Sequence, residues 1–175
     1  MTVKIRSGMF ETNSSSMHVI SVDGKPTYDQ MIKPNRNGKI ILRGGWFCRE
    51  WRVYRSARSK AAYCLTFAYR VRDIGVPSWI NDRLWKLETP EEALDKSRYL
   101  IDMLKRVIEN HTGHEVVFVW DIENWIIDHQ SFHIARKVFS DEETLKAFIF
   151  SSRSVLVTGD DNEDVPRRFR KYFCG

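Results

Sequence analysis

Short apolar stretches separated by polar turns occupy the first quarter of the chain, and this pattern predicts β-strands. VKIRSGMF at 3–10, HVISV at 18–22 and KIILR at 39–43 are rich in β-branched and apolar residues, as strands on a pleated, half-buried surface are. Asp23-Gly24 and Gly44-Gly45 supply turn signals after two of them. Between these strands a short helix is expected after Pro26.

Helical periodicity begins near residue 56. Over 56–72, apolar residues recur on one face of a helix, at Ala57, Ala61, Cys64, Leu65, Ala68 and Val71. Thr89, Pro90 and Glu92 form a capping box that starts a second helix, and Gly113 is its natural stop. Residues 78–86 predict another short helix.

The last third of the chain predicts two more strands with one helix before the second of them. EVVFVW at 115–120 does not alternate, which predicts a strand buried on both faces. Ser140 and Glu143 resemble a capping box, and the helix after it would turn Leu145, Phe148 and Ile149 inward. SVLVT at 154–158 predicts the final strand. Strands and helices mix without strict alternation, which favours an α+β fold.

The predicted architecture is therefore a single α+β domain over residues 1–175. It would hold a mixed sheet of about five strands packed by two or three helices. A chain of 175 residues suits one domain, and its 42% hydrophobic and 13% aromatic content is that of a globular protein.

Composition also limits the cellular setting. The apolar runs are too short to span a membrane, no signal peptide is expected, and no membrane partner is predicted. Three cysteines without paired spacing favour reduced thiols and a cytoplasmic location. The sequence has no glycine-rich nucleotide loop, kinase signature, nucleophile elbow or paired CxxC, which excludes the commonest enzyme classes and leaves open whether the protein is an enzyme. No cofactor is indicated.

Charge is distributed unevenly along the chain. Residues 1–75 hold fourteen Lys and Arg against five Asp and Glu, whereas residues 76–175 hold fourteen against eighteen. The excess is concentrated in 36–60, and a second basic cluster lies near the C-terminus, at Arg167, Arg168, Arg170 and Lys171. This asymmetry suggests an anionic partner.

The run GGWFCREWRVYRSARSK at 44–60 interleaves basic and aromatic residues. Single-stranded nucleic acids are bound by aromatic rings that stack on bases and arginines that contact phosphates. The candidate nucleic-acid contacts are Trp51 and the basic residues Arg43, Arg49, Arg52, Arg55, Arg58 and Lys60, with the arginines at a spacing that would line one side of a helix. The alternative is an ordinary element with tryptophans inside and arginines solvated.

The polar cluster in FETNSSSMH, residues 10–18, is the first candidate site. Its hydroxyl and amide groups could simply fix a turn between the first two strands. They could instead cradle a phosphate or oxyanion, with His18 as an acid or base near neutral pH. The candidate phosphate ligands are Asn13, Ser14, Ser15 and Ser16.

IIDHQS at 126–131 is the second candidate site, with Asp128 and His129 as catalytic candidates and Ser131 as a ligand. Adjacent side chains on an extended segment point in opposite directions, so Asp128 does not simply orient His129 as in a triad. A packed loop is the alternative. His129 and His133 are four residues apart, but no glutamate or cysteine pair completes a zinc motif, and no metal site is predicted. GDDN at 159–162 predicts a solvated turn.

Three segments resemble a family of small bacteriophage and bacterial proteins. They are FETNSSSMH, IIDHQS, and LKAFIFSSRSVLVTGDDN at 145–162, and the family carries FETNSSSxH followed by an IDHQS motif. Residues 25–110 contribute nothing to the resemblance. It implies an intracellular phage or bacterial protein, in the host cytoplasm if phage-encoded. The family has no established activity and so implies no catalytic residues.

Two functional hypotheses result. In the first, the NSSSxH and DHQS segments form one site that binds or acts on a phosphate-bearing ligand, a nucleotide or nucleic acid, with the basic region attracting the polyanion. In the second, the protein is a non-catalytic module that binds nucleic acid or inhibits a host protein.

Overall fold

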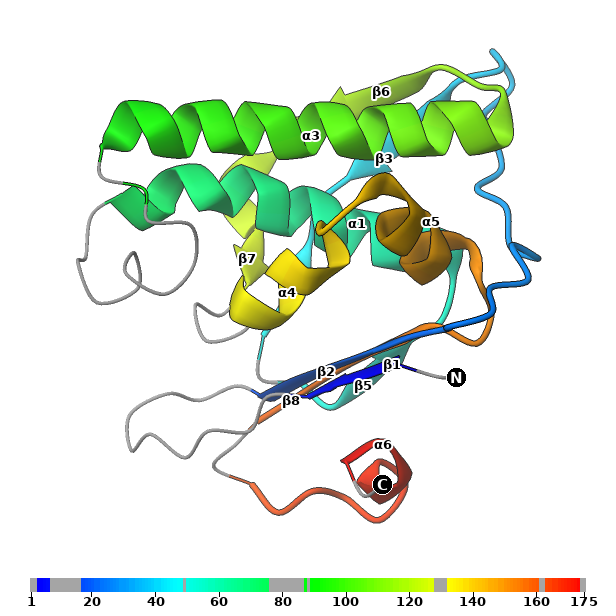
Figure 1. Cartoon of the computed structure of the whole chain (residues 1–175), viewed down its shortest axis with the longest axis vertical. Helices are drawn as coiled ribbons and strands as arrows, with labels where there is room; N and C mark the ends of the chain where they lie inside the picture. The colour runs from blue at the N-terminus through cyan, green and yellow to red at the C-terminus, as the bar shows by residue number, and fades with distance from the viewer. Residues whose placement is uncertain are drawn as a thin grey trace.

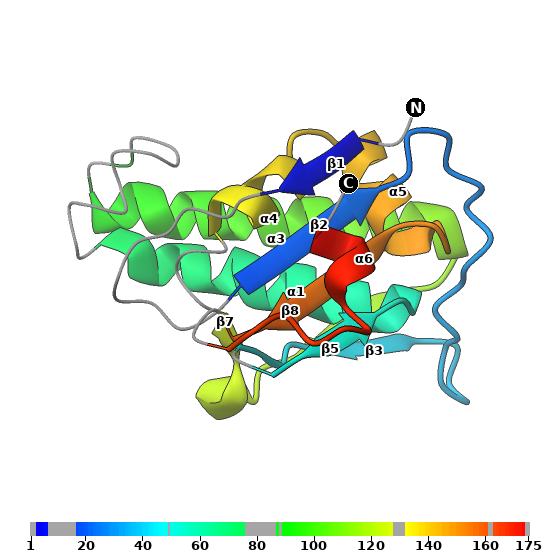
Figure 2. The same cartoon turned by 90° about the horizontal axis from the view of Figure 1, so that it is seen from below.

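The largest sheet joins the two ends of the chain. The computed structural model describes residues 3–6, 17–48, 50–75, 87, 89–127, 132–160 and 163–173. Strands β1 (Val3–Arg6), β2 (Met17–Val22), β8 (Val155–Gly159) and β5 (Arg52–Tyr54) form an antiparallel sheet in the order β1-β2-β8-β5. All five residues of β8 are buried, so this late strand lies in the interior of the sheet, between two early ones (Figure 2).

Two short parallel pairs accompany this sheet. Strand β3 (Ile40–Arg43) pairs with β6 (Val116–Val119), and β4 (Trp46–Phe47) pairs with β7 (Ile126–Ile127). The α+β class is confirmed, but the strands of the described residues form three small sheets rather than one mixed sheet. The bend at Gly44-Gly45 separates β3 from β4. A Cβ on Gly44 would overlap the indole of Trp125, so only glycine fits there.

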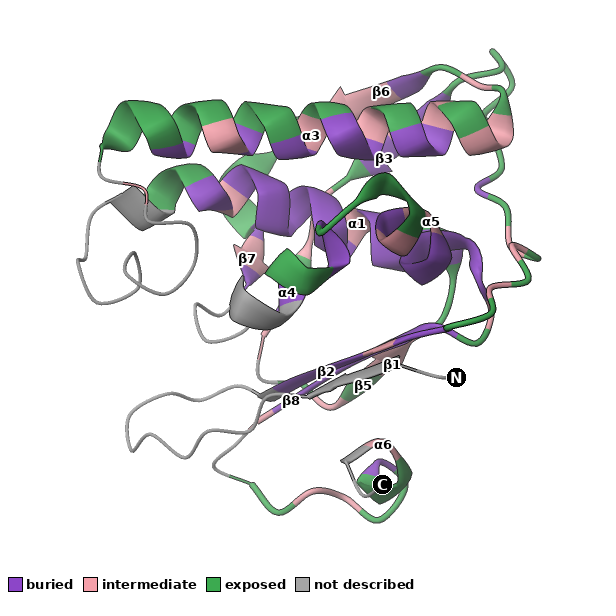
Figure 3. Cartoon of the chain, viewed as in Figure 1, coloured by how far each residue is buried: buried purple, intermediate pink, exposed green. Residues whose placement is uncertain are grey.

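Helix α1 (Ala57–Arg70) is the centre of the helical layer, and the short η1 helix (Val71–Gly75) extends it. Figure 1 shows α1 between the antiparallel sheet and the long helix α3 (Pro90–Thr112), with α4 (Phe132–Val138) and α5 (Glu142–Phe150) beside it. Ten of its residues are buried, and in Figure 3 most of its ribbon has the colour of buried residues. The predicted apolar stripe is present, but burial extends well around it because neighbours cover several sides.

Helix α3 confirms the predicted capping box. The Thr89 hydroxyl accepts from the Glu92 amide at 3.1 Å, and the Glu92 carboxylate accepts from the Thr89 amide at 3.3 Å. Gly113 ends the helix with φ of 71°, a left-handed conformation that glycine adopts without strain.

Other elements differ from their predictions. Residues after Pro26 form no helix; instead Asp29 holds this segment against Ser152, accepting from its amide at 2.9 Å and from its hydroxyl at 2.6 Å. In β6 only Val116 is fully buried, and among the described residues this strand has one partner, β3. The helix predicted at 78–86 lies outside the described residues.

Helix α5 also starts from a different cap. Asp141, rather than Ser140, is its N-cap, and the Asp141 carboxylate accepts from the Thr144 amide at 2.7 Å. Hydrogen bonds from Thr144 and Ser140 lower the pKa of Asp141. The inward Leu145, Phe148 and Ile149 are buried as predicted.

Two alanine variants can test whether Asp141, rather than Ser140, caps α5. Asp141→Ala should lower the free energy of unfolding by about 1 kcal/mol, because it leaves an orphan amide at the helix start. Ser140→Ala is the matched control and should change it by less than about 0.5 kcal/mol. Urea denaturation at neutral pH measures both. A larger loss for Ser140→Ala than for Asp141→Ala would contradict this assignment.

Lys60 is a fully buried lysine on α1, with 0% of its surface exposed. Its ammonium donates to the carbonyl of Ser151 at 2.7 Å and to that of Ser154 at 3.1 Å. It thereby satisfies backbone groups where α5 ends and β8 begins. Desolvation lowers the pKa of Lys60 to about 8, because burial disfavours the charged form.

This lysine makes stability depend on pH. Between pH 8 and 10.5 the unfolded chain binds the proton and the folded chain has released it, so the free energy of unfolding rises with pH. From about pH 7.5 to 9.5 the gain should be about 2 kcal/mol in the wild type relative to Lys60→Met. Urea denaturation across this range provides the measurement. The exposed Lys137→Met is the control and should follow the wild type; identical pH slopes for wild type and Lys60→Met would disprove the assignment.

Candidate functional site

His18 is the one candidate catalytic residue that the structure describes. It lies on β2, opposite Thr158 of β8, and only 2% of its surface is exposed. Its Nδ1 lies 3.4 Å from the hydroxyl of Tyr63 on α1, and the two ring centroids are 5.9 Å apart. Burial raises the pKa of Tyr63 well above its usual value, so this phenol stays protonated. His18 is therefore part of the sheet–helix interface.

The other residues of the two polar segments lie outside the described residues. These are Asn13, Ser14, Ser15, Ser16, Asp128, His129 and Ser131. The phosphate cradle and the acid–base pair therefore stay predictions.

The described residues that flank these two segments do lie close together. Phe47 on β4 pairs with Ile127, the last described residue before the DHQS segment. The Phe47 ring is perpendicular to that of Tyr63, with centroids 5.2 Å apart, and Tyr63 contacts His18. Helix α4, which begins just after the DHQS segment, also packs against β2. Chain segments more than 100 residues apart are thus joined through Phe47 and Tyr63.

The basic run at 43–60 is divided among several parts of the molecule. Its arginines do not line a helix, because residues 46–47 and 52–54 are strands. Arg43 pairs with Asp121 at 3.0 Å, and Arg52 pairs with Glu50 at 2.6 Å. Arg58 donates to the carbonyls of Ile41 and Lys33. Arg49 lies outside the described residues.

Lys60 corrects the predicted set of nucleic-acid contacts. Its side chain is fully buried and its ammonium is bound to two backbone carbonyls. Reaching a phosphate would require removing it from the core, so its assignment as a nucleic-acid contact is wrong.

Trp51 and Arg55 meet the C-terminal segment on the outer side of the antiparallel sheet. There, Phe169 packs with Val19, Val155 and Val157 in a second, small apolar cluster. The Trp51 and Phe169 rings lie 5.3 Å apart. Figures 1 and 2 show the short helix α6 (Arg170–Phe173) lying across this side of the sheet, opposite the other helices.

This packing brings Arg55, from the first basic cluster of the sequence, beside the second cluster at 167–171. We call the resulting surface the basic face; its exposed cations are Arg55, Arg167, Arg168, Arg170 and Lys171. The guanidinium of Arg55 hydrogen-bonds to the Tyr172 hydroxyl. Arg55 and Lys171 lie 5.7 Å and 5.2 Å from the centroid of the Tyr172 ring, and Arg168 lies 4.9 Å from that of Phe169. Aromatic rings therefore position three of the five cations.

The cations of the basic face differ from the other arginines of the run in their partners. Among the described residues, none of the five has a carboxylate within salt-bridge distance, whereas Arg43 and Arg52 are paired. The nearby acidic Glu163 accepts from the Trp51 indole at 3.1 Å. The positive charge of this surface is therefore largely uncompensated by direct pairing.

The sequence identified both basic clusters but did not indicate that Arg55 of the first lies beside the second. Alternation along 51–55 was the available signal, because Trp51, Val53 and Arg55 share one side of the extended segment. The side on which α6 packs depends on β8 lying beside β5, a pairing of residues more than 100 positions apart.

Comparison with known proteins adds no assignment to these surfaces. No family model, curated protein or solved structure matches the chain. No helix in the described part of the chain is long and apolar enough to cross a membrane. Within the same residues, no group of three or more His, Cys, Asp and Glu side chains is arranged to hold a metal ion.

Proposed function

We propose that the protein binds nucleic acid through the basic face. The observation that carries this proposal is the meeting of Arg55 with the cluster at 167–171 on one surface, with no paired carboxylate among the described residues. Clustered cations that are not neutralised by neighbours bind phosphate backbones and release condensed counterions.

The contacts expected on this face are with phosphates rather than bases. Tyr172 is half-buried, and its ring is accompanied by Arg55 and Lys171. A ring with cations near it has little surface left for stacking on a base. Binding through phosphates positions a strand without reading its sequence, so weak dependence on base composition is expected.

The test removes two cations that take part in no hydrogen bond or salt bridge among the described residues. Arg168→Gln/Lys171→Gln should weaken binding of a fluorescent single-stranded oligonucleotide by roughly tenfold near 0.1 M salt. It should also reduce the magnitude of the slope of log K against log salt concentration by about one to two, because fewer counterions are released. Fluorescence anisotropy across a salt series measures both quantities.

The matched control removes the same charge elsewhere. Lys105→Gln/Arg106→Gln, on α3, should leave affinity within about twofold. Equal losses in the two double variants would mean that only net charge matters, and an unchanged affinity in the Arg168/Lys171 variant would refute the role of the basic face.

A second candidate function rests on the convergence of the polar segments. We propose that the NSSSxH and DHQS segments form one site for a phosphate-bearing ligand. The supporting observation is that their described flanks meet through Phe47 and Tyr63.

Alanine variants in the polar segments separate the two candidates. If the second candidate is right, Ser15→Ala and His129→Ala should each abolish saturable binding of inorganic phosphate, followed by 31P NMR, and should leave oligonucleotide binding intact. Thr112→Ala, in α3, is the control and should keep phosphate binding. Phosphate binding that persists in both Ser15→Ala and His129→Ala would exclude this site.

A further inference from the structure

A surface groove on the helical side of the molecule lies far from the basic face. Its volume is about 500 Å³, within the range of small-molecule sites. Its walls come from the end of α1, η1, the first half of α3, and the turn between β6 and η2 (Ile122–Asn124). The lining is mainly apolar and aromatic, and its principal members are Tyr69, Leu94, Ile101, Trp120 and Ile122.

Trp120 is the most unusual of these side chains. It is 49% exposed, yet three aromatic rings support it: Tyr69 at 5.9 Å, Phe118 at 5.7 Å and Trp125 at 5.5 Å between centroids. Three of the six large hydrophobic residues that are exposed in the described part of the chain line this groove, namely Leu94, Trp120 and Ile122. Apolar surface concentrated in a concave site is typical of ligand binding.

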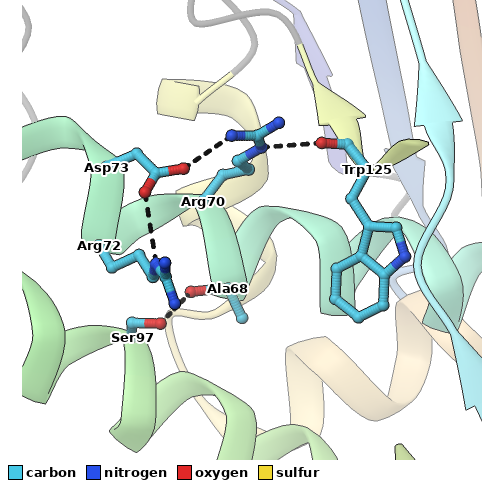
Figure 4. A network of polar contacts seen from close by, with 6 residues as sticks. All are labelled: Ala68, Arg70, Arg72, Asp73, Ser97 and Trp125. Atoms are coloured by element: carbon cyan, nitrogen blue, oxygen red, sulfur yellow. Dashed lines mark hydrogen bonds and ion pairs between the residues drawn. The ribbon is translucent and has the colours of Figure 1, made fainter. Parts of the chain in front are cut away.

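Hydrogen bonds hold together the elements that form the groove. Figure 4 shows Asp73 joining Arg70, at 2.8 Å, to Arg72, at 3.3 Å, while Arg70 also donates to the Trp125 carbonyl at 2.8 Å. The buried Ser97 hydroxyl donates to the Ala68 carbonyl at 2.7 Å and so links α3 to α1. The groove is therefore largely pre-formed, which lowers the ordering cost of binding.

The rim of the groove offers both donors and an acceptor. The guanidinium of Arg72 lies 4.3 Å from the centroid of the Tyr69 ring, and that of Arg98 pairs with Asp95 at 3.3 Å. Asp102 also belongs to the lining, and it has no salt bridge among the described residues. The carboxylate of Asp102 is thus an acceptor available to a ligand.

We infer that this groove binds a nucleobase, as part of a free nucleotide or of a single strand. The ring would stack on Trp120, because an indole face is a sequence-tolerant platform for planar bases. Asp102 would accept from an amino or ring N–H group on the edge of the base, and the arginines would donate to its carbonyl oxygen or ring nitrogen. A purely apolar ligand would leave these rim groups unused, and a simple anion would leave Trp120 unused. Guanine, which carries donors and acceptors on separate edges, matches this rim best.

The probes for this site are guanosine 5′-monophosphate and ribose 5-phosphate. With the full chain, the nucleotide should shift the Trp120 indole N–H signal in 1H–15N NMR and saturate below about 10 mM, whereas ribose 5-phosphate should not. Trp120→Leu and Asp102→Ala should each weaken nucleotide binding by about tenfold or more, the loss expected for one stacked base or one hydrogen bond to a charged group. Trp46→Leu, at another half-exposed tryptophan, should bind like the wild type.

The outcomes distinguish this site from the basic face. Equal binding of ribose 5-phosphate, no saturation by the nucleotide, or equal losses in Trp120→Leu and Trp46→Leu would each overturn the inference. Arg168→Gln/Lys171→Gln should leave nucleotide binding unchanged, so failure of the basic face does not affect this test. A short guanosine-containing oligonucleotide that also shifts the Trp120 signal would identify a strand as a source of the base; a shift with the mononucleotide alone would identify free nucleotide.

Discussion

The burial of α1 between α3 and the antiparallel sheet determines where the other described elements lie. The helix packs against α3, α4, α5, β3 and β7, so its side chains contact partners around much of its circumference. Polar groups in such a helix must be satisfied internally. Lys60 and Thr66 meet this requirement by hydrogen-bonding to backbone groups where chain segments turn: Lys60 between α5 and β8, and Thr66 at the Gly44-Gly45 bend. The same hydrogen bonds that satisfy the buried polar side chains of the helix thus position the ends of neighbouring elements.

Both proposed binding surfaces follow from this arrangement. With α1 covering one side of the sheet, the other side is left to the C-terminal segment, and Phe169 attaches that segment through the second apolar cluster. The basic cluster at 167–171 is thereby held beside Arg55. On the opposite side of α1, its end and η1 line the groove together with the first half of α3 and with Trp120.

Local signals predicted the elements well where one residue type has one physical role. The Thr89–Glu92 box and Gly113 fixed both ends of α3, because orphan amides and a left-handed residue need those side chains. The alternation of HVISV predicted β2 for a similar reason. At α5 a side-chain N-cap was predicted correctly, but at Ser140 instead of Asp141. Both residue types are good caps, and only the chain geometry selects Asp141. Lys60 shows the limit of sequence patterning, since a charged residue amid basic neighbours predicts solvent exposure, whereas its two carbonyl partners come from residues 151 and 154.

Long-range pairing accounts for what the sequence did not indicate about function. The basic face requires β8 to lie between β2 and β5, and the groove requires the turn after β6 to lie near η1. Neither of these long-range relations can be predicted from the hydrophobic periodicity of the sequence. Because α6 and α3 lie on opposite sides of the antiparallel sheet (Figure 1), and the two surfaces share no residue, binding at one need not alter the charge or packing at the other. A single strand that used both would have to pass around the edge of the molecule, so a short oligonucleotide should engage one surface at a time. Variants in one surface should therefore leave the affinity of the other for a short ligand unchanged, as is expected of distant sites without shared partners.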